Sequence, residues 1–405
     1  MLIQILLVIL AIALTLPCSV LLIECLSAFL SAFLSDRSPS RSAVSADNEN
    51  TLPIAVLMPA HNEAEVIAGT LAALMPQLTP KDRLIVVADN CTDETAKIAR
   101  QTGATVLERT DTDRRGKGYA LDYGLQVLSV EPPAAVVIVD ADCQFQRGCV
   151  HQLTHEAITH QRPVQGIYLI DQPVQPSLKE SVSAFAFKVK NLVRPLGLKQ
   201  LHMPCLLTGT GMAFPWSVIS TVDLASQSIV EDMKLGFDLA VAGTPPMLCQ
   251  SVIVTGPLPP NDTAAKTQRT RWEHGHLQLM AQYCPQLFSQ ALVQRRLDLL
   301  AIALDLLIPP LSLLVILWSS VSLVVTLAAA LSGFWLPAWI CYGAGTMLLV
   351  SVVSAWAGFA QSDLALQTLL SVPLYLIWKI PVYLKFVKAP QVEWVRTDRQ
   401  VQPDE

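Results

Sequence analysis

The sequence predicts an α/β domain, built on a mostly parallel β-sheet and flanked by membrane-spanning helices. Of its 405 residues, 52% are hydrophobic and 15% charged, whereas an average soluble domain carries about 25% charged residues. Most charges lie between Asp36 and Arg296, so the two apolar ends suit a membrane. Between them, short β-rich runs alternate with helical patterns, which indicates a parallel sheet covered on both faces.

The apolar stretch from Leu2 to about Leu34 predicts a membrane helix, because about 20 apolar residues span a bilayer. It is too long for a signal-peptide core and has no basic region before it. Arg37 and Arg41 follow it directly, and positive charge marks the cytoplasmic side. We therefore expect a multi-pass protein of the inner cell membrane, with the N-terminus outside and the central domain in the cytosol.

Changes in composition predict the domain boundaries. We expect a membrane helix at 1–34, a serine-rich linker at 35–50, the α/β domain at 51–285, an interfacial segment at 286–303, membrane and interfacial helices at 304–388, and a polar tail at 389–405. The apolar stretches near the C-terminus are Leu304–Leu331, Trp335–Phe359 and Leu366–Val387. The last contains Lys379 and two prolines, so it either spans the membrane or lies at its interface.

Acidic residues follow several of the expected strands. The strands are Ile54–Met58, Leu84–Ala88, Ala104–Leu107, Val136–Val139 and Val164–Ile170, and the helices between them are Glu65–Leu78, Asp93–Gln101, Tyr119–Val130 and Gly148–Thr159. Glu63 follows the first strand, Asp89 the second, and Asp140 and Asp142 the fourth. Ligands of such sheets bind beyond the carboxyl ends of the strands, so we expect these acids to share one site.

Asp140 and Asp142 are the strongest candidates for a metal site. Residues two apart on a strand point the same way, and neighbouring carboxylates repel each other unless a cation lies between them. Mg²⁺ or Mn²⁺ suits the pair, since such an ion also binds substrate phosphates. The simpler alternative is a strand end with one capping and one solvated aspartate. Lys117, between two glycines, can approach a diphosphate or form part of a flexible turn.

Further candidates lie beyond the first five strands. Asp232 can act as a general base toward an acceptor hydroxyl, or can be stabilised by the start of a helix that we expect at Met233–Ala242. The small-residue segment Leu207–Gly211 either lets backbone approach a ligand closely or forms only a turn. The sequence Gln268-Arg-Thr-Arg-Trp272 offers Arg271 to a departing diphosphate and Trp272 to a sugar, unless it is an amphipathic helix that faces lipid. His274 and His276 suit packing better than metal binding.

The motifs PAHNE, DNCTD, DAD, VED and QRTRW, in this order, resemble those of the inverting family 2 glycosyltransferases, which have the GT-A fold. The membrane-embedded branch, with cellulose, chitin and hyaluronan synthases and ceramide glucosyltransferases, is the most similar. The resemblance covers roughly Pro53–Trp272. Departures are Val230, where many members have threonine, and Asp122, where polymer synthases usually have asparagine.

This resemblance implies a role for each matching residue. Asp232 would be the catalytic base, and Arg271 would stabilise the leaving diphosphate. Asp142, with Asp140, would bind the metal. The expected donor-binding residues are Glu63, Asp89, Lys117, Asp140, Asp142 and Gln268. The expected acceptor-binding residues are Trp272, Gly209, Thr210 and Glu231.

The implied reaction is transfer of a hexose from a nucleotide-diphosphate sugar, such as a UDP-sugar, to a glycan acceptor with a β-linkage, in exopolysaccharide synthesis. One alternative is single addition to a lipid acceptor. Another is an inactive membrane scaffold that has kept the fold. Four apolar segments are few for a polymer channel, which favours a homo-oligomer or a secretion partner if a polymer is exported. The net charge of -5 gives no reason to expect nucleic acid.

Overall fold

The computed structural model describes residues 1–35, 52–173, 175–225, 230–258, 262–369 and 372–388. The chain forms two compact units. Of the described residues, the helical unit comprises those within 1–35, 172–203 and 276–388, and the sheet unit comprises those within 52–171 and 204–275. One long helix, α10 (Asp262–Gln294), begins in the sheet unit and continues in the helical unit.

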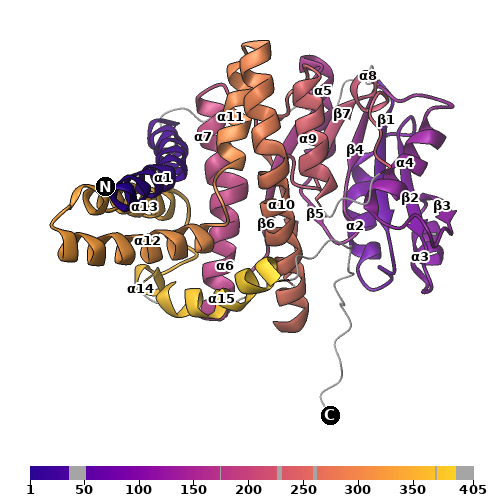
Figure 1. The fold of residues 1–405 in the computed structure, drawn as a ribbon. Helices are drawn as coiled ribbons and strands as arrows, with labels where there is room; N and C mark the ends of the chain where they lie inside the picture. Colours follow the sequence, from indigo (N-terminus) through magenta and orange to yellow (C-terminus); the bar gives the residue numbers. More distant parts are fainter. Residues whose placement is uncertain (36–51, 174, 226–229, 259–261, 370–371, 389–405) are drawn as a thin grey trace. The chain divides into compact units, whose positions relative to one another are not determined.

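In the described part of the sheet unit, eight strands form one mixed sheet in the order β3-β2-β1-β4-β7-β6-β8-β5 (Figure 1). The strands are β1 (Ile54–Ala60), β2 (Arg83–Asp89), β3 (Thr105–Arg109), β4 (Ala135–Ile138), β5 (Gln144–Phe145), β6 (Val164–Ile170), β7 (Met212–Pro215) and β8 (Met247–Gly256). The five predicted strands are confirmed, with ends that differ by at most two residues. The strands β5, β7 and β8 were not predicted from the sequence.

The strand directions change in the middle of the sheet. β1 to β4 contain the parallel pairs β1–β2, β2–β3 and β1–β4, as predicted. β7 is antiparallel to both of its neighbours, β4 and β6. Its register pairs Met212 with Ile138, so the chain entering β7 and the chain leaving β4 meet at the same edge of the sheet.

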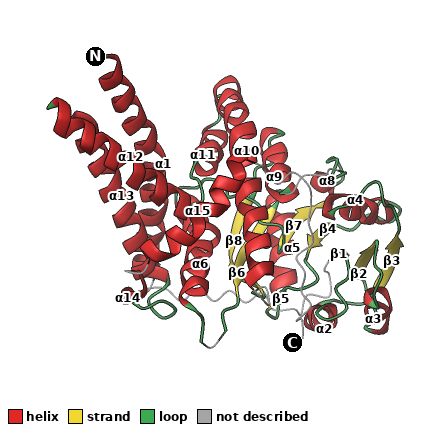
Figure 2. Cartoon of the chain, turned by 60° about the horizontal axis from the view of Figure 1, so that its bottom comes forward, coloured by secondary structure: helices red, strands yellow, loops and turns green. Residues whose placement is uncertain are grey.

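Helices cover both faces of this sheet. Its helices are α2 (Ile67–Leu74) with the short η1 (Met75–Gln77), α3 (Thr95–Gln101), α4 (Lys117–Leu128), α5 (Cys149–His160), α8 (Trp216–Ile219) and α9 (Glu231–Val241). Successive strand residues point to opposite faces: Val56 packs with residues of α2 and α5, whereas Leu57 packs with residues of α4 and α9. Figure 2 shows the sheet lying between α2 and α4. Gly124 lets α4 approach closely, because a Cβ there would lie 2.4 Å from Leu57 Cδ1.

The helical unit contains three described helices that are long and apolar enough to cross a membrane, within Leu2–Phe33, Leu311–Ser332 and Leu336–Phe359. They belong to α1 (Leu2–Ser35), α12 (Leu311–Ser332) and α13 (Leu336–Phe359); α1 packs against α13, and α12 lies beside α13 (Figure 1). The other helices are α6 (Leu178–Lys188), the π-helical η2 (Val189–Val193), α7 (Arg194–Gln200), α11 (Leu297–Leu306), α14 (Leu366–Leu369) and α15 (Val372–Lys388).

Two of the expected C-terminal apolar segments are divided differently in the structure. Instead of one helix over Leu304–Leu331, α11 ends at Leu306 and α12 begins at Leu311. Two prolines, which cannot supply the backbone N–H that a continuous helix needs, separate them. The expected segment Leu366–Val387 contains the short α14 and the 17-residue α15, and neither is among the described helices that are long enough to span.

A buried group of charges joins three helices of the helical unit. Arg194 on α7 donates from Nε to Glu24 Oε2 on α1 at 2.9 Å, and from Nη2 to the backbone oxygen of Asp305 on α11 at 2.6 Å and to its carboxylate. Each of the three residues is at most 5% exposed. A Cβ at Gly197, in the same helix as Arg194, would lie 2.0 Å from the Glu24 carbonyl oxygen, so α1 and α7 touch backbone to backbone.

Arg194→Leu removes the cation from this group and leaves two carboxylates buried. We expect the free energy of unfolding to fall by about 3–5 kcal/mol, as for the loss of one partner of a buried pair. The thermal stability of the full-length protein in detergent measures this. Lys97→Leu breaks the exposed pair between Lys97 and Glu94 and should leave stability nearly unchanged. Equal stability of the two variants would contradict a structural role for the buried group of Glu24, Arg194 and Asp305.

Candidate active site

The carboxyl end of β4 carries the expected pair of acids. Ligand atoms of Asp140, Asp142 and Cys143 all lie within 4.8 Å of one another. Carboxylate oxygens are the ligands that Mg²⁺ and Mn²⁺ prefer. Cys143 is fully buried, and burial raises the pKa of its thiol well above the ordinary value, whereas a metal binds the thiolate. The donor set that fits a hard divalent cation is therefore Asp140 and Asp142.

Lys117 is the first residue of α4, and it extends its ammonium into this group of acids. Its Nζ donates to Asp140 Oδ1 and, at 2.6 Å, to the carbonyl oxygen of Gly209. Burial alone would lower the pKa of Lys117, but the charges of Asp140, Glu231 and Asp232 raise it above its ordinary value. Lys117 therefore stays charged and lies in the first turn of a helix, not in a flexible turn.

Glu231 and Asp232 begin α9 on the other side of Lys117. Burial raises the pKa of Glu231 to about 7, the charge of Lys117 opposes this shift, and the charge of Asp232 adds to it. A Cβ at Gly209 would lie 3.3 Å from Asp232 Oδ2 and 3.6 Å from Lys117 Nζ. These distances place the Asp232 carboxylate beside the same backbone segment that binds Lys117.

The segment before β7 is also part of the site. Gly209 and Gly211 have φ values of 90° and 63°, which favour glycine. Between them, Thr210 Oγ1 accepts a hydrogen bond from the backbone N–H of Asp140 at 3.1 Å. The expected acceptor-binding residues Gly209 and Thr210 thus lie directly against Lys117 and Asp140.

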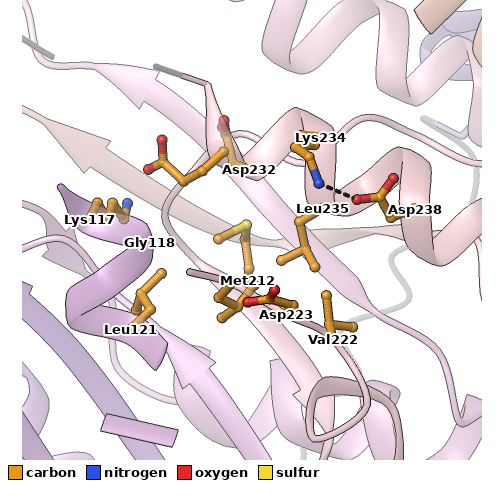
Figure 3. A pocket seen from close by; sticks show the side chains of 12 residues that line it. Lys117, Gly118, Leu121, Met212, Val222, Asp223, Asp232, Lys234, Leu235 and Asp238 are labelled. Carbon is orange, nitrogen blue, oxygen red and sulfur yellow. Dashed lines mark hydrogen bonds and ion pairs between the residues drawn. The ribbon is translucent and has the colours of Figure 1, made fainter. Parts of the chain in front are cut away.

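A pocket opens beside these charges. Figure 3 shows Lys117 and Asp232 on one side of the pocket and the loop with Val222 and Asp223 on the other. Met212 lies between these two sides. The Lys234–Asp238 ion pair, with Nζ 2.7 Å from Oδ2, lies at its edge. The lining residues are Lys117, Gly118, Leu121, Met212, Val222, Asp223, Leu224, Glu231, Asp232, Lys234, Leu235 and Asp238.

Asp89, at the end of β2, is bound by Arg109, which was not predicted from the sequence as a site residue. Arg109 Nη1 donates to Asp89 Oδ1 at 2.6 Å, and Arg109 also donates to Asp111 and to the Arg114 carbonyl oxygen. Its guanidinium lies 5.8 Å from the centre of the Tyr119 ring. Arg109 follows the predicted strand Ala104–Leu107 by two residues, at the edge of the sheet where the acids lie. This position could have indicated that it pairs with one of them.

Glu63 lies in the turn between β1 and α2. Its backbone N–H donates to Thr95 Oγ1 at 2.8 Å, and its carbonyl oxygen accepts from Ile67 at 3.0 Å. Because α2 begins at Ile67, Glu63 lies in the turn that leads into this helix, and its expected role in donor binding stays a prediction.

The QRTRW sequence lies on α10, where Gln268, Arg271 and Trp272 are half-buried. Three residues after Trp272, a Cβ at Gly275 would lie 2.9 Å from Val230 Cγ1, so α10 packs closely against the residue before Glu231. The expected contacts of Gln268, Arg271 and Trp272 with diphosphate and acceptor stay predictions.

His276 has a packing role, as expected. Its Nε2 lies 3.0 Å from the Ile308 carbonyl oxygen. Burial lowers the pKa of His276 well below its ordinary value, so the ring is neutral and donates to that oxygen.

A model of the family described as "Glycosyltransferase like family 2" matches residues 52–275. The 4,4'-diaponeurosporenoate glycosyltransferase of Staphylococcus aureus (strain USA300) is 37% identical over 101 residues, which are 25% of this chain and 26% of that protein. The matched stretch therefore spans about a quarter of that relative.

One solved structure shows the same fold as this chain, and a second is less similar. The mannosyltransferase PcManGT from Pyrobaculum calidifontis, in complex with GDP-Man and Mn²⁺, superposes with a TM-score of 0.51 at 19% identity and covers 88% of this chain and 100% of its own. Glucosyl-3-phosphoglycerate synthase from Mycobacterium tuberculosis, in complex with Mn²⁺, UDP and phosphoglyceric acid, superposes with a TM-score of 0.34 at 19% identity. The match covers 49% of this chain and 68% of that one. The first likeness identifies the sheet unit as a GT-A fold.

Gly209→Ala is expected to reduce turnover, because its methyl group would crowd Asp232 and Lys117 at a positive φ. A small displacement of reacting groups lowers turnover by about 10-fold to 100-fold. Gly103→Ala is the matched control: Gly103 also has a φ of 90°, but its Cβ would meet only the flexible end of Met75, at 3.4 Å. Both variants should lose similar thermal stability, by about 1–2 kcal/mol. Equal turnover of the two would contradict a site at Gly209.

Proposed function

The chain belongs to glycosyltransferase family 2, whose model matches residues 52–275, and we propose that it transfers a hexose from a nucleotide-diphosphate sugar to an acceptor hydroxyl with inversion. The observation that carries this proposal is the convergence of Asp140, Asp142, Lys117 and Asp232 from three separate segments beside one pocket. A scaffold without activity would not need a base, a buried ammonium and a metal-binding pair together.

The donor would bind at the ends of β2 and β4. Asp140 and Asp142 would hold Mg²⁺ or Mn²⁺, which would neutralise the diphosphate of the donor. Asp89 accepts a hydrogen bond from Arg109 with Oδ1, so its carboxylate is oriented before substrate arrives. It would accept hydrogen bonds from the base, either uracil or guanine, with Glu63 beside it. Gln268 and Arg271 would bind the diphosphate from α10, with Arg271 stabilising the charge that develops as it leaves.

Asp232 would take the proton of the acceptor hydroxyl as the hydroxyl oxygen attacks the anomeric carbon. The bond to the diphosphate breaks on the opposite face of the sugar, so an α-linked donor gives a β-linked product. Lys117 would hold Asp140 and the Gly209 segment in place during this step. Glu231 is adjacent to Asp232, and with a pKa of about 7 it can contact the acceptor as either a donor or an acceptor of a hydrogen bond.

For the acceptor, we favour a membrane lipid that receives a single sugar. The supporting observations are the S. aureus relative, which is named for the glycosylation of 4,4'-diaponeurosporenoate, and the three candidate spans in the described helices, which are few for a polymer channel. Trp272, Gly209 and Thr210 would contact the acceptor. A glycan acceptor in exopolysaccharide synthesis is the second candidate. The QRTRW sequence on α10 fits either acceptor, because it resembles the signature of polymer synthases and of ceramide glucosyltransferases. Product mass after incubation with a labelled donor separates the two.

The three spans suit a catalytic domain in the cytosol at the inner membrane. Arg37 and Arg41 indicate that α1 begins outside the cell and ends in the cytosol. α12 would then cross the membrane outward and α13 would cross it back, so that the segment after α13 is cytosolic. α15 would then lie at the interface, since it has 17 residues with Pro381 inside. This places the basic residues of the C-terminal tail in the cytosol, in agreement with the positive-inside rule.

Asp232→Asn should lower transfer by about 10²–10⁴-fold, the usual contribution of a general base, and should leave nucleotide binding nearly unchanged. Product formation is measured with the donor found in a screen of UDP- and GDP-hexoses, and binding of UDP or GDP by calorimetry. Glu156→Gln, on α5 at the other face of the sheet, is the control and should keep full activity. Wild-type turnover in Asp232→Asn would show that the base is misassigned.

Removal of divalent cations should abolish transfer. Treatment with EDTA is expected to stop product formation, and Mn²⁺ or Mg²⁺ should restore it, since the Asp140–Asp142 pair fits these ions. Asp142→Asn should raise the Mn²⁺ concentration needed for half-maximal activity about 10-fold or more. An enzyme that keeps full activity in EDTA would not use this pair to bind a required metal.

A further inference from the structure

The segment Thr208–Gly211 connects three of the residues to which we assign roles in transfer. Its Gly209 carbonyl accepts from Lys117, its Thr210 hydroxyl accepts from the Asp140 backbone, and its Gly209 Cα faces the Asp232 carboxylate. Movement of this segment would therefore move the ammonium and the acids relative to one another. The question is what fixes a stretch that contains two glycines with positive φ values.

Gln165 on β6 makes three hydrogen bonds with its carboxamide, and two of them go to this segment. Its Oε1 accepts from the Thr208 backbone N–H at 2.8 Å, and its Nε2 donates to the Thr210 carbonyl at 2.9 Å and to the Gly166 carbonyl at 2.7 Å. The side chain is 2% exposed, so water does not compete for these bonds. Next to it, the Gly166 backbone N–H donates to the Gly211 carbonyl at 2.8 Å.

At this position the segment needs a side chain that accepts a hydrogen bond from the Thr208 N–H and donates one to the Thr210 carbonyl. The glutamine carboxamide does both. Glutamate keeps the acceptor for Thr208 but has no N–H for the Thr210 carbonyl. Leucine fills a similar volume and leaves buried backbone groups of the segment without partners, which is costly. Gln165 lies on β6, whereas Asp140 follows β4 and Asp232 lies on α9, so the three residues come from separate elements.

We propose that Gln165 is a positioning residue for glycosyl transfer: its carboxamide fixes Thr208–Gly211 and so sets the places of Lys117, Asp140 and Asp232. This inference rests on the proposed function. Gln165 acts only through the segment and contacts neither donor nor acceptor. Its loss therefore lowers the catalytic rate at saturating donor, beyond any change in stability.

The chain offers a matched control in Gln77. This glutamine is also buried, at 7% exposed, and it too bridges backbone groups, donating to the Ala73 carbonyl at 2.9 Å and accepting from Val150 N–H at 3.4 Å. Its partners lie in α2 and α5, away from the segment. Gln165→Leu and Gln77→Leu, made in the full-length protein in detergent, should lose comparable thermal stability.

The measurement is kcat and the donor KM, with whichever UDP- or GDP-hexose the wild-type protein turns over. Gln165→Leu should lower kcat at least about 10-fold, while Gln77→Leu should retain kcat within about 2-fold. Gln165→Glu keeps the acceptor for the Thr208 N–H but sets a carboxylate oxygen against the Thr210 and Gly166 carbonyl oxygens, so it should also lower kcat. If Gln165→Leu does not fold, the comparison is made between Gln165→Glu and Gln77→Glu. Equal kcat values at the two positions would overturn the inference.

Thr210→Val gives an independent check, because it removes the hydroxyl that binds the Asp140 N–H. If Gln165 acts through the segment, Thr210→Val should reduce kcat less in the Gln165→Leu background than in the wild type. If Thr210→Val lowers kcat by the same factor in the Gln165→Leu background as in the wild type, the inference is overturned. Loss of transfer in Asp232→Asn together with equal kcat at positions 165 and 77 would reject the inference alone, whereas a wild-type chain that turns over no donor would reject the proposed function as well.

Discussion

The ammonium of Lys117 is the charge around which the acids of the sheet unit are gathered. It binds Asp140 directly and lies close enough to Glu231 and Asp232 for their charges to raise its pKa. Carboxylates brought together at a partly buried edge repel one another, so the arrangement needs this cation. One ammonium does not balance the acids that converge there, and a divalent cation between Asp140 and Asp142 would offset more of their charge.

The position of Lys117 in turn depends on the directions of the strands. Because β7 runs against β4, its first residue pairs with the last residue of β4, and the segment entering β7 reaches the ends of the parallel strands. An all-parallel sheet would place that segment at the opposite edge. The reversed strand is thus the reason that Gly209 and Thr210 can contact Lys117 and Asp140, which come from an earlier part of the chain.

The sequence was sufficient for the parts of the fold and site that local patterns determine. The alternation of strands and helices predicted the parallel half of the sheet, and the acids at strand ends predicted the pair at Asp140 and Asp142. Partners distant in the chain were not predictable in this way. Arg109 and Gln165 are single polar residues in or beside strands, and nothing nearby in the sequence shows which backbone or carboxylate they reach. A glutamine within the otherwise apolar VQGIYLI was a signal, since buried polar groups are nearly always hydrogen-bonded.

Glu24 has a consequence for how the protein is made. α1 is synthesised and meets the bilayer before the ribosome reaches Arg194, and Asp305 comes later still. During that interval a carboxyl group lies in an otherwise apolar segment without the guanidinium that later binds it, and an ionisable group in lipid is costly. The first helix is therefore a weaker independent anchor than its length suggests. The backbone contact at Gly197 becomes available when about half of the 405 residues have been translated, and the three-residue charge group is complete only after Asp305, at about three quarters of the chain.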